Sequence, residues 1–351
     1  MVSRNIALDY AKGIGIVVVV FAHLWRGLSG AGLLDNWRPD LVAGVSSACT
    51  LLSMPIFFFV SGLLYGRGME RRHGLKEFAG KVDAIFYPYL IWSVVIGLFE
   101  VLGSGLRNHS GGWGNLLDIL WNPHGIFWFL YVLLLTFALV ELVIYLAGVQ
   151  RARLLALPMG ALLLLAYPWA PKLFCLPELC MSFIYFAVGL TLAGALPKVQ
   201  KPSWPGFMLA LAGLSLLTFM VHAVWDMGTH SLRSVSPNAL LTALAILVLF
   251  MAMCYALPEK GLAWLAYLGE RSMDIYLVHL LFVATVRIFL QKAIHAHALM
   301  IYLVPGICLG IGGSLILTHW LKSGRAKYLF APPDFLSLKA RLASAGQPAA
   351  A

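Results

Sequence analysis

Long apolar runs alternate with short polar segments along the whole chain. The runs are cut wherever proline, glycine and charged residues cluster, and each is close to the roughly 20 residues that a membrane-spanning helix needs. The pattern predicts an all-α polytopic membrane protein with about ten transmembrane helices. The predicted spans cover residues 6–28, 41–66, 83–103, 125–148, 153–170, 178–197, 204–224, 237–257, 272–291 and 299–321.

The composition leaves little sequence for a water-soluble domain, because 61% of the 351 residues are hydrophobic and only 11% are charged. We predict one transmembrane domain over residues 1–331 and a mobile cytoplasmic tail over residues 332–351. The first apolar run contains Asp9 and Lys12 and is followed by no small-residue cleavage site. It is therefore interpreted as a retained span rather than a signal peptide.

The formal charge of +10 is explained by membrane topology rather than by a nucleic-acid partner. The connections after every second predicted span and the two termini carry 17 Lys and Arg residues, against seven on the opposite side. Cytoplasmic loops carry the excess of cations, so both termini are expected in the cytoplasm. The opposite loops are assigned Arg26, Arg38, Arg107, Lys172, Arg233, Arg287 and Lys292.

The first span carries a stripe of ionisable residues. Lys12 and His23 are 11 residues apart, close to three full helical turns, and Asp9 lies near the same face. Lys12 and His23 would lie about 16 Å apart along the helix axis, a separation that suits a long bound molecule with an anionic group at Lys12 and a reacting group at His23. In the alternative interpretation Lys12 reaches the headgroups and His23 hydrogen-bonds a neighbouring helix.

Other spans also contain polar residues that need an explanation. Ser61 and Gly62 permit close helix approach, while a nucleophilic role for Ser61 lacks a nearby base in the sequence. Glu141 needs a partner or a proton at its depth.

Further along, Arg271 and Asp274 are three residues apart and are expected to pair. His279 is interpreted either as a ligand for polar substrate or as a buried structural residue.

Two loops offer chemistry with competing interpretations. The basic loop from Arg67 to Lys81 can attract the phosphates of a nucleotide-like donor or anionic membrane lipids. Cys175 and Cys180 can form a disulfide in an oxidising compartment or remain two unpaired thiols. No metal is expected, because a metal would want more ligands than this pair offers.

Four segments together resemble the acyltransferase-3 family of integral membrane acyltransferases, in the branch with fucose and exopolysaccharide O-acetylases. They are LDYAKGIGIVVVVFAH (8–23), PIFFFVSGLLYG (55–66), IFWFLYVLL (126–134) and LGERSMDIYLVH (268–279). In the first, a basic residue is followed by ten positions and a histidine, with Lys12 where Arg is common. Before Pro-Tyr, many relatives carry an Arg-x-x-Arg-like cluster, of which only Lys81 remains in KVDAIFYPY.

The resemblance implies a ten-helix bacterial inner-membrane enzyme that passes an acyl group from cytoplasmic acyl-CoA to a sugar hydroxyl of a cell-surface or exported glycan. The donor is expected to be acetyl-CoA, with succinyl as the alternative acyl group. Partners are the glycan or lipid-linked sugar acceptor and membrane lipids. The resemblance leaves the oligomeric state open. The resemblance and the polar positions within the spans together assign His23 to catalysis, Lys12, Lys81, Ser61 and Gly62 to the donor, and Asp9, Trp128 and His279 to substrate.

In the implied mechanism, His23 acts as general base on the sugar hydroxyl, with an acyl-histidine relay as the variant. The rival hypothesis is a transporter or flippase of a glycan or lipid-linked sugar that uses the same buried polar groups without covalent chemistry. The sequence shows no internal repeat and few intramembrane carboxylates for ion coupling, which weighs against transport.

Overall fold

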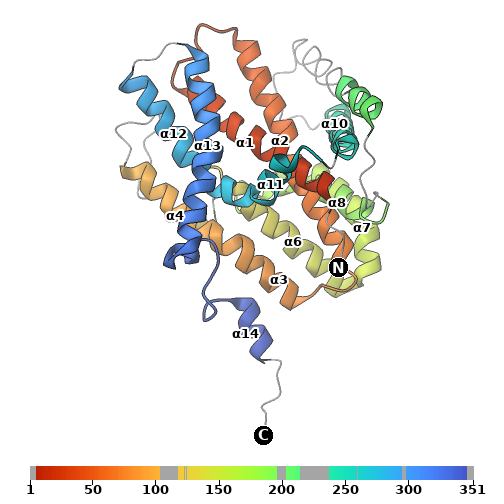
Figure 1. The fold of residues 1–351 in the computed structure, drawn as a ribbon. Helices are drawn as coiled ribbons and strands as arrows, with labels where there is room; N and C mark the ends of the chain where they lie inside the picture. Colours follow the sequence, from red (N-terminus) through yellow and green to blue (C-terminus); the bar gives the residue numbers. More distant parts are fainter. Residues whose placement is uncertain are drawn as a thin grey trace. The chain divides into compact units, whose positions relative to one another are not determined.

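The computed structural model describes residues 5–102, 118–121, 123, 125–195, 203–213, 237–258, 260–294 and 298–345. Within these residues all regular secondary structure is helical (Figure 1). This confirms the predicted all-α fold. Helices satisfy their own backbone hydrogen bonds, as a segment in lipid must.

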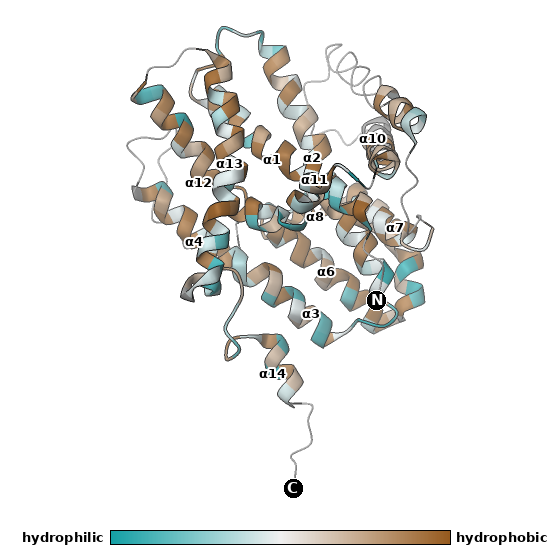
Figure 2. Cartoon of the chain, in the orientation of Figure 1, coloured by the Kyte–Doolittle hydropathy of each residue, from teal (hydrophilic) through white to brown (hydrophobic). Residues whose placement is uncertain are grey.

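Seven described helices are long and apolar enough to cross a membrane, and Figure 2 shows them mainly in hydrophobic colours. They are α1 (Ile6–Gly30), α2 (Pro39–Gly68), the run of α3 (Leu75–Lys81), η1 (Val82–Phe86) and α4 (Tyr87–Leu102), then α6 (Trp128–Ala147), α7 (Val149–Ala166) with η4 (Tyr167–Trp169), α12 (Ser272–Lys292) and α13 (Leu299–Ser323).

Shorter apolar helices lie at the other three predicted spans. They are α8 (Leu176–Leu192), the helix Trp204–Gly213 and the segment Ala243–Ala256 of α10 (Pro237–Ala256). The remaining short elements are η3 (Asp118–Leu120), α11 (Ala263–Glu270), η5 (Arg325–Leu329) and α14 (Leu338–Ala345). The chain is a multi-pass membrane protein, and the count of ten spans stays a prediction, since part of the predicted span 204–224 lies outside the described residues.

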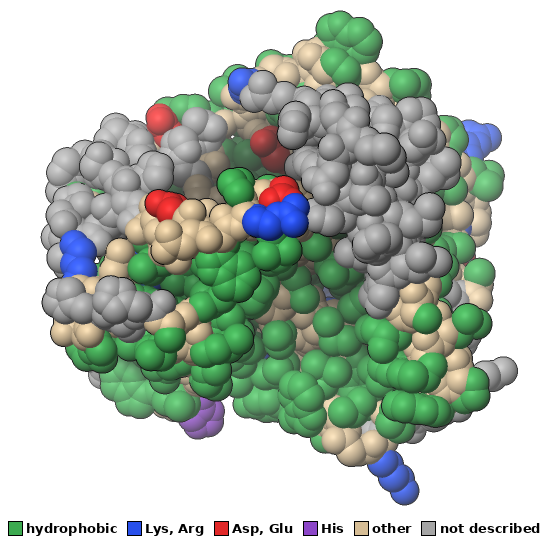
Figure 3. Space-filling model, turned by 90° about the horizontal axis from the view of Figure 1, so that it is seen from above, with side chains coloured by type: hydrophobic (Ala, Val, Ile, Leu, Met, Phe, Trp, Pro, Cys, Tyr) green, Lys and Arg blue, Asp and Glu red, His purple; other side chains and the backbone are tan. Residues whose placement is uncertain are grey.

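Large apolar side chains remain exposed on the span helices. Leu146, Leu154 and Leu162 are examples, on α6 and α7. Figure 3 shows a face whose described side chains are mostly hydrophobic, with few charged ones. Exposed apolar surface of this extent is typical of contact with lipid.

The chain divides into two compact units. The first comprises residues 1–60 and 195–316, and α1 packs within it against α10, α11 and α12. Helices α1 and α11 approach closely at two glycines. A side chain at Gly13 would collide with the backbone of Leu265, and one at Gly269 with the backbone of Asp9. These two positions bring the start of α1 directly against α11.

Three cations assigned above to outer loops, Arg26, Arg287 and Lys292, lie inside helices of the first unit. Arg287, assigned above to an outer loop, belongs to α12 and is only 6% exposed. Its aliphatic stem packs beside Gly27 of α1, and its guanidinium donates to Gln291 at 3.3 Å. The assignment to a loop was wrong because hydropathy alone does not distinguish a cation in the last turns of a membrane helix from a cation in the loop that follows.

The second unit comprises residues 61–194 and 317–351. Its interior contains a cluster of the aromatic rings of Tyr65, Phe137 and Phe186, with centroids 5.3 to 6.2 Å apart. Gly62 lies against the backbone of Phe186, so that no side chain fits there. The last turns of α2 are thereby held against α8.

A π-helical segment, η1, carries Asp83, which caps the C-terminal helix α14. The Asp83 carboxylate accepts hydrogen bonds from the Ser337 hydroxyl (2.7 Å) and from the backbone N–H groups of Leu338 (3.0 Å) and Lys339 (3.1 Å). A carboxylate at a helix N-terminus satisfies free N–H groups and complements the helix dipole. The capped helix α14 lies within the predicted tail over residues 332–351. The predicted boundary at residue 332 stays a prediction.

Candidate active site

Two histidines from distant parts of the sequence lie side by side in the first unit. The rings of His23 on α1 and His279 on α12 have centroids 5.2 Å apart and an interplanar angle of 49°. The His23 side chain is partly exposed, whereas His279 has no exposed surface. The sequence analysis named both residues but gave no reason to place them together.

The surroundings of His279 fix its protonation pattern. Its Nδ1 atom lies 2.8 Å from the carbonyl oxygen of Tyr276 and 3.1 Å from that of Ile275. Carbonyl oxygens only accept hydrogen bonds, so Nδ1 carries the proton. Its Nε2 atom is buried and hydrogen-bonds to no described atom.

The polar stripe predicted on α1 is partly an ion pair. The Lys12 ammonium lies 2.8 Å from the Asp9 carboxylate, which is buried at 7% exposure. Asn5 donates to the Tyr255 hydroxyl (3.1 Å), and the Tyr10 hydroxyl donates to the Pro258 carbonyl (2.8 Å). These contacts fix the start of α1, and Asp9 neutralises Lys12. The predicted roles of Lys12 and Asp9 in binding stay predictions.

The predicted pair at the start of α12 is confirmed. Arg271 and Asp274 lie 3.6 Å apart, and the Arg271 guanidinium also lies over the ring of Tyr267, 5.7 Å from its centroid. The Asp274 side chain is mostly buried and that of Arg271 is exposed. The pair therefore stabilises the first turn of α12.

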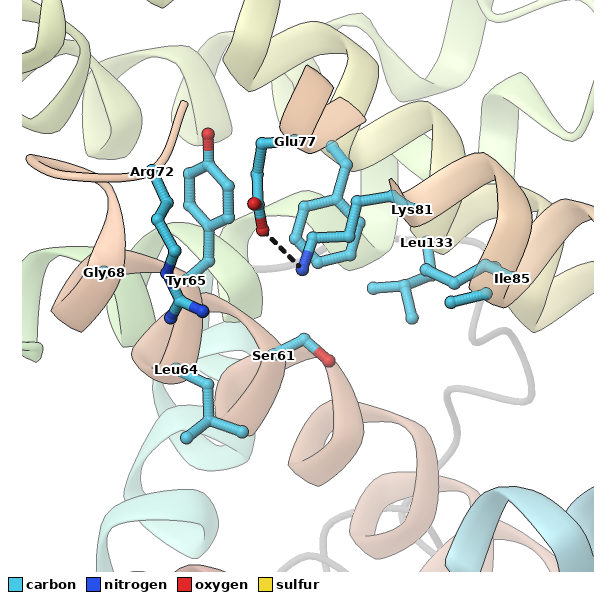
Figure 4. Close-up of a pocket in the computed structure, with 11 residues that line it drawn as sticks. Ser61, Leu64, Tyr65, Gly68, Arg72, Glu77, Lys81, Ile85 and Leu133 are labelled. Atoms are coloured by element: carbon cyan, nitrogen blue, oxygen red, sulfur yellow. Dashed lines mark ion pairs between the residues drawn. The ribbon is translucent and has the colours of Figure 1, made fainter. Parts of the chain in front are cut away.

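The second unit contains a pocket of about 310 Å³ with charged and apolar walls. Figure 4 shows Ser61 from α2, Arg72 from the following loop and Lys81 from α3 around it. The Lys81 ammonium lies 3.5 Å from Glu77 and stacks over the ring of Phe137 at 4.9 Å. The lining residues are Ser61, Leu64, Tyr65, Gly68, Arg72, Glu77, Lys81, Ala84, Ile85, Leu133 and Phe137.

The chain is similar to a known protein family and to two curated proteins. A family model described as an acyltransferase domain matches residues 5–319. The chain belongs to the acyltransferase-3 family. It is therefore a membrane acyltransferase, an enzyme class that transfers acyl groups.

Two curated relatives carry the name Nodulation protein NolL. The one from Sinorhizobium fredii is 26% identical over 140 residues, which is 40% of this chain and 37% of that protein. The one from Mesorhizobium japonicum is 21% identical over 230 residues, which is 65% of this chain and 58% of that protein. The matches thus span about a third to three fifths of the relatives' length. No solved structure matches the chain.

Three predicted residues of this acyltransferase occupy different surroundings. Ser61 lines the pocket with Lys81, and the binding of the donor by these two residues stays a prediction. The neighbouring Gly62 has a packing role against Phe186. Trp128 is the first residue of α6, is half-buried, and does not line the described pocket. Donor contact by Gly62 and substrate contact by Trp128 stay predictions.

The sequence analysis missed Glu77 and Tyr65 and treated Arg72 only as part of a basic loop. Tyr65 lies four residues after Ser61 and Glu77 four residues before Lys81, spacings that put each pair on one helical face. This four-residue spacing is the feature of the sequence that could have identified Tyr65 and Glu77. The position of Arg72, in a loop, carries no such periodicity.

Cys175 and Cys180 of this acyltransferase form no disulfide and are free thiols in the structure. The disulfide interpretation is therefore not realised in the structure. Cys175 precedes α8 with a left-handed backbone, φ 52°. Burial, with a smaller effect from the Glu178 carboxylate, raises the pKa of Cys175 to about 12.

Proposed function

We propose that the protein is an O-acyltransferase of a bacterial inner membrane that moves an acyl group, acetyl in the first instance, from cytoplasmic acyl-CoA to a sugar hydroxyl of a cell-surface or exported glycan. The observation that carries the proposal is that the ring centroids of His23 on α1 and the buried His279 on α12 lie 5.2 Å apart in an acyltransferase-family chain. Family membership favours this enzyme over the transporter hypothesis.

His23 acts as the general base. An unprotonated imidazole nitrogen removes the proton from the sugar hydroxyl as the oxygen attacks the thioester carbonyl. The new C–O ester bond forms, the C–S bond breaks, and the CoA thiolate leaves and takes up the proton that His23 received. General base catalysis of this kind contributes about 10² to 10⁴ in rate. Direct transfer leaves no acyl group on the enzyme, in contrast to the acyl-histidine variant.

The donor's phosphates bind the basic pocket of the second unit. Arg72 and Lys81 supply the positive charge, and Ser61 supplies a hydroxyl. Guanidinium and ammonium groups are the common protein ligands of phosphate. Lys12, with its partner Asp9, is retained as a further donor contact, and Trp128 as an acceptor contact.

The test compares purified full-length protein with His23→Ala and His319→Ala. His319 is an exposed histidine on α13 and serves as the matched control. Radiolabelled acetyl-CoA is the donor, and total cell glycan freed of its esters by alkali is the acceptor. We expect label transfer by the wild type and His319→Ala, and a loss of about 10²-fold or more in His23→Ala.

Two outcomes of this experiment would contradict the proposal. Equal transfer by His23→Ala and the wild type would remove His23 from the mechanism. An absence of label transfer by the wild type, with no thermal stabilisation by millimolar acetyl-CoA, would reject the enzyme proposal.

A further inference from the structure

His279 is a buried imidazole whose Nδ1 atom is hydrogen-bonded and whose Nε2 atom is not. The Nδ1–H group is shared between the carbonyl oxygens of Ile275 and Tyr276 on its own helix. In a neutral ring this tautomer leaves the lone pair at Nε2, an atom that is buried and hydrogen-bonds to no described atom. A buried acceptor without a partner destabilises the fold, which points to a donor that binds there during function.

His23 provides that donor at a suitable distance. An ordinary N–H···N hydrogen bond of about 2.9 Å puts two imidazole ring centres roughly 5 Å apart, since each nitrogen lies about 1.1 Å from its ring centre. The observed separation is 5.2 Å. The two rings are not hydrogen-bonded in the structure, so the bond requires a rotation of the His23 ring.

We propose that His279 is a positioning residue that accepts a hydrogen bond from His23 through Nε2 and thereby keeps the other nitrogen of His23 unprotonated and directed at the acceptor hydroxyl. The inference rests on the proposed function and reassigns His279 from substrate contact to support of the base. Without an exposed face, His279 offers no surface to a substrate in this structure.

The arrangement forms a chain of three groups. The carbonyl oxygens of the α12 backbone set the tautomer of His279, His279 sets the tautomer of His23, and His23 takes the hydroxyl proton. A base that is oriented by a third group is a general feature of acyl-transfer sites. When His23 becomes an imidazolium, the neutral Nε2 of His279 stabilises it as a hydrogen-bond acceptor and takes no proton.

The test compares His279→Gln with His279→Leu in the label-transfer assay. The amide oxygen of glutamine reaches the place of Nε2 and accepts a hydrogen bond, whereas leucine fills a similar space without an acceptor. We expect His279→Leu to lower kcat by about 10²-fold, with the KM for acetyl-CoA within threefold of the wild type, and His279→Gln to restore kcat to within tenfold.

Several results would overturn the inference. These are a kcat of His279→Leu within threefold of the wild type, a rise in the acceptor KM at constant kcat, or equal loss in the Gln and Leu variants. Thermal stabilisation by acetyl-CoA in both variants verifies that they are folded. Failure of the wild type itself to transfer label, by contrast, rejects the proposed function rather than the role of His279.

Discussion

The phenol of Tyr65 donates a 2.7 Å hydrogen bond to Oε1 of Glu141, and Oε2 of the same carboxylate accepts the backbone N–H of Gly74 at 2.8 Å. Glu141 thus joins α2 and α6 and holds the end of the loop that carries Arg72. The sequence showed only that a carboxylate at this depth needs a partner. Its two hydrogen bonds give Glu141 a structural role beside the pocket that Tyr65 lines.

Removal of this carboxylate should weaken the fold and the pocket together. Glu141→Ala leaves the Tyr65 hydroxyl and the Gly74 N–H without their acceptor, which we expect to cost about 3 kcal/mol and to raise the KM for acetyl-CoA several-fold. Thermal unfolding midpoints and donor saturation curves measure both effects. Tyr65→Phe should show a smaller loss, and Tyr145→Phe, at an 86% exposed position on α6, none. A Glu141→Ala midpoint equal to the wild type would contradict this role.

The ion pair of Glu77 with Lys81 should limit donor affinity. Glu77→Gln frees the Lys81 ammonium for phosphate, so we expect the KM for acetyl-CoA to fall two- to fivefold, because a partly exposed pair is worth up to about 1 kcal/mol. The effect should weaken as salt screens the charges. Glu70→Gln is the control, since Glu70 is exposed and paired with Arg153 at 3.4 Å. Equal KM changes in the two variants would indicate a general charge effect instead.

Gly62 should not tolerate a side chain. Gly62→Ala places a methyl group against the backbone of Phe186, and such overpacking costs about 1–3 kcal/mol. We expect a lower unfolding midpoint and less folded protein after extraction. Gly312→Ala on α13 is the matched control, because a Cβ atom there meets nothing within 4 Å. A Gly62→Ala protein as stable as the Gly312→Ala protein would show that α2 and α8 can separate at no cost.

The raised pKa of Cys175 should slow its alkylation. With a pKa of about 12, roughly one thiol in 10⁴ is ionised at pH 8, and the iodoacetamide rate should rise about tenfold per pH unit from 8 to 11. The same thiol unfolded in SDS should titrate near its ordinary pKa, about 8.5. The raised pKa also means that this group stabilises the fold below about pH 8.5 and that the contribution is lost by about pH 12.

Peptide mass spectrometry assigns the label to Cys175, and a Cys175→Ser protein provides the blank. Alkylation at pH 8 as fast as in SDS would show that the thiol is accessible and ionises normally.

Local rules predicted much of the fold and part of the site. Helix positions follow from apolar run length, and the pairing of Arg271 with Asp274 follows from their spacing of three residues. Contacts between distant segments were out of reach. Tyr65 and Glu141 are 76 residues apart, and the meeting of His23 with His279 depends on how α1 and α12 pack. Hydropathy indicates which segments lie in the membrane, but it does not indicate which helices pack against each other.

The cap of α14 by Asp83 has a consequence for handling the protein. Asp83 lies two residues after Lys81, on the same helical run as Glu77, so the C-terminal segment is anchored next to a wall of the pocket that Lys81 lines. A truncation before Ser337, or a fusion partner spliced there, strips three hydrogen-bond donors from the Asp83 carboxylate. Affinity tags therefore belong after residue 345, where they leave the three hydrogen bonds of Asp83 intact.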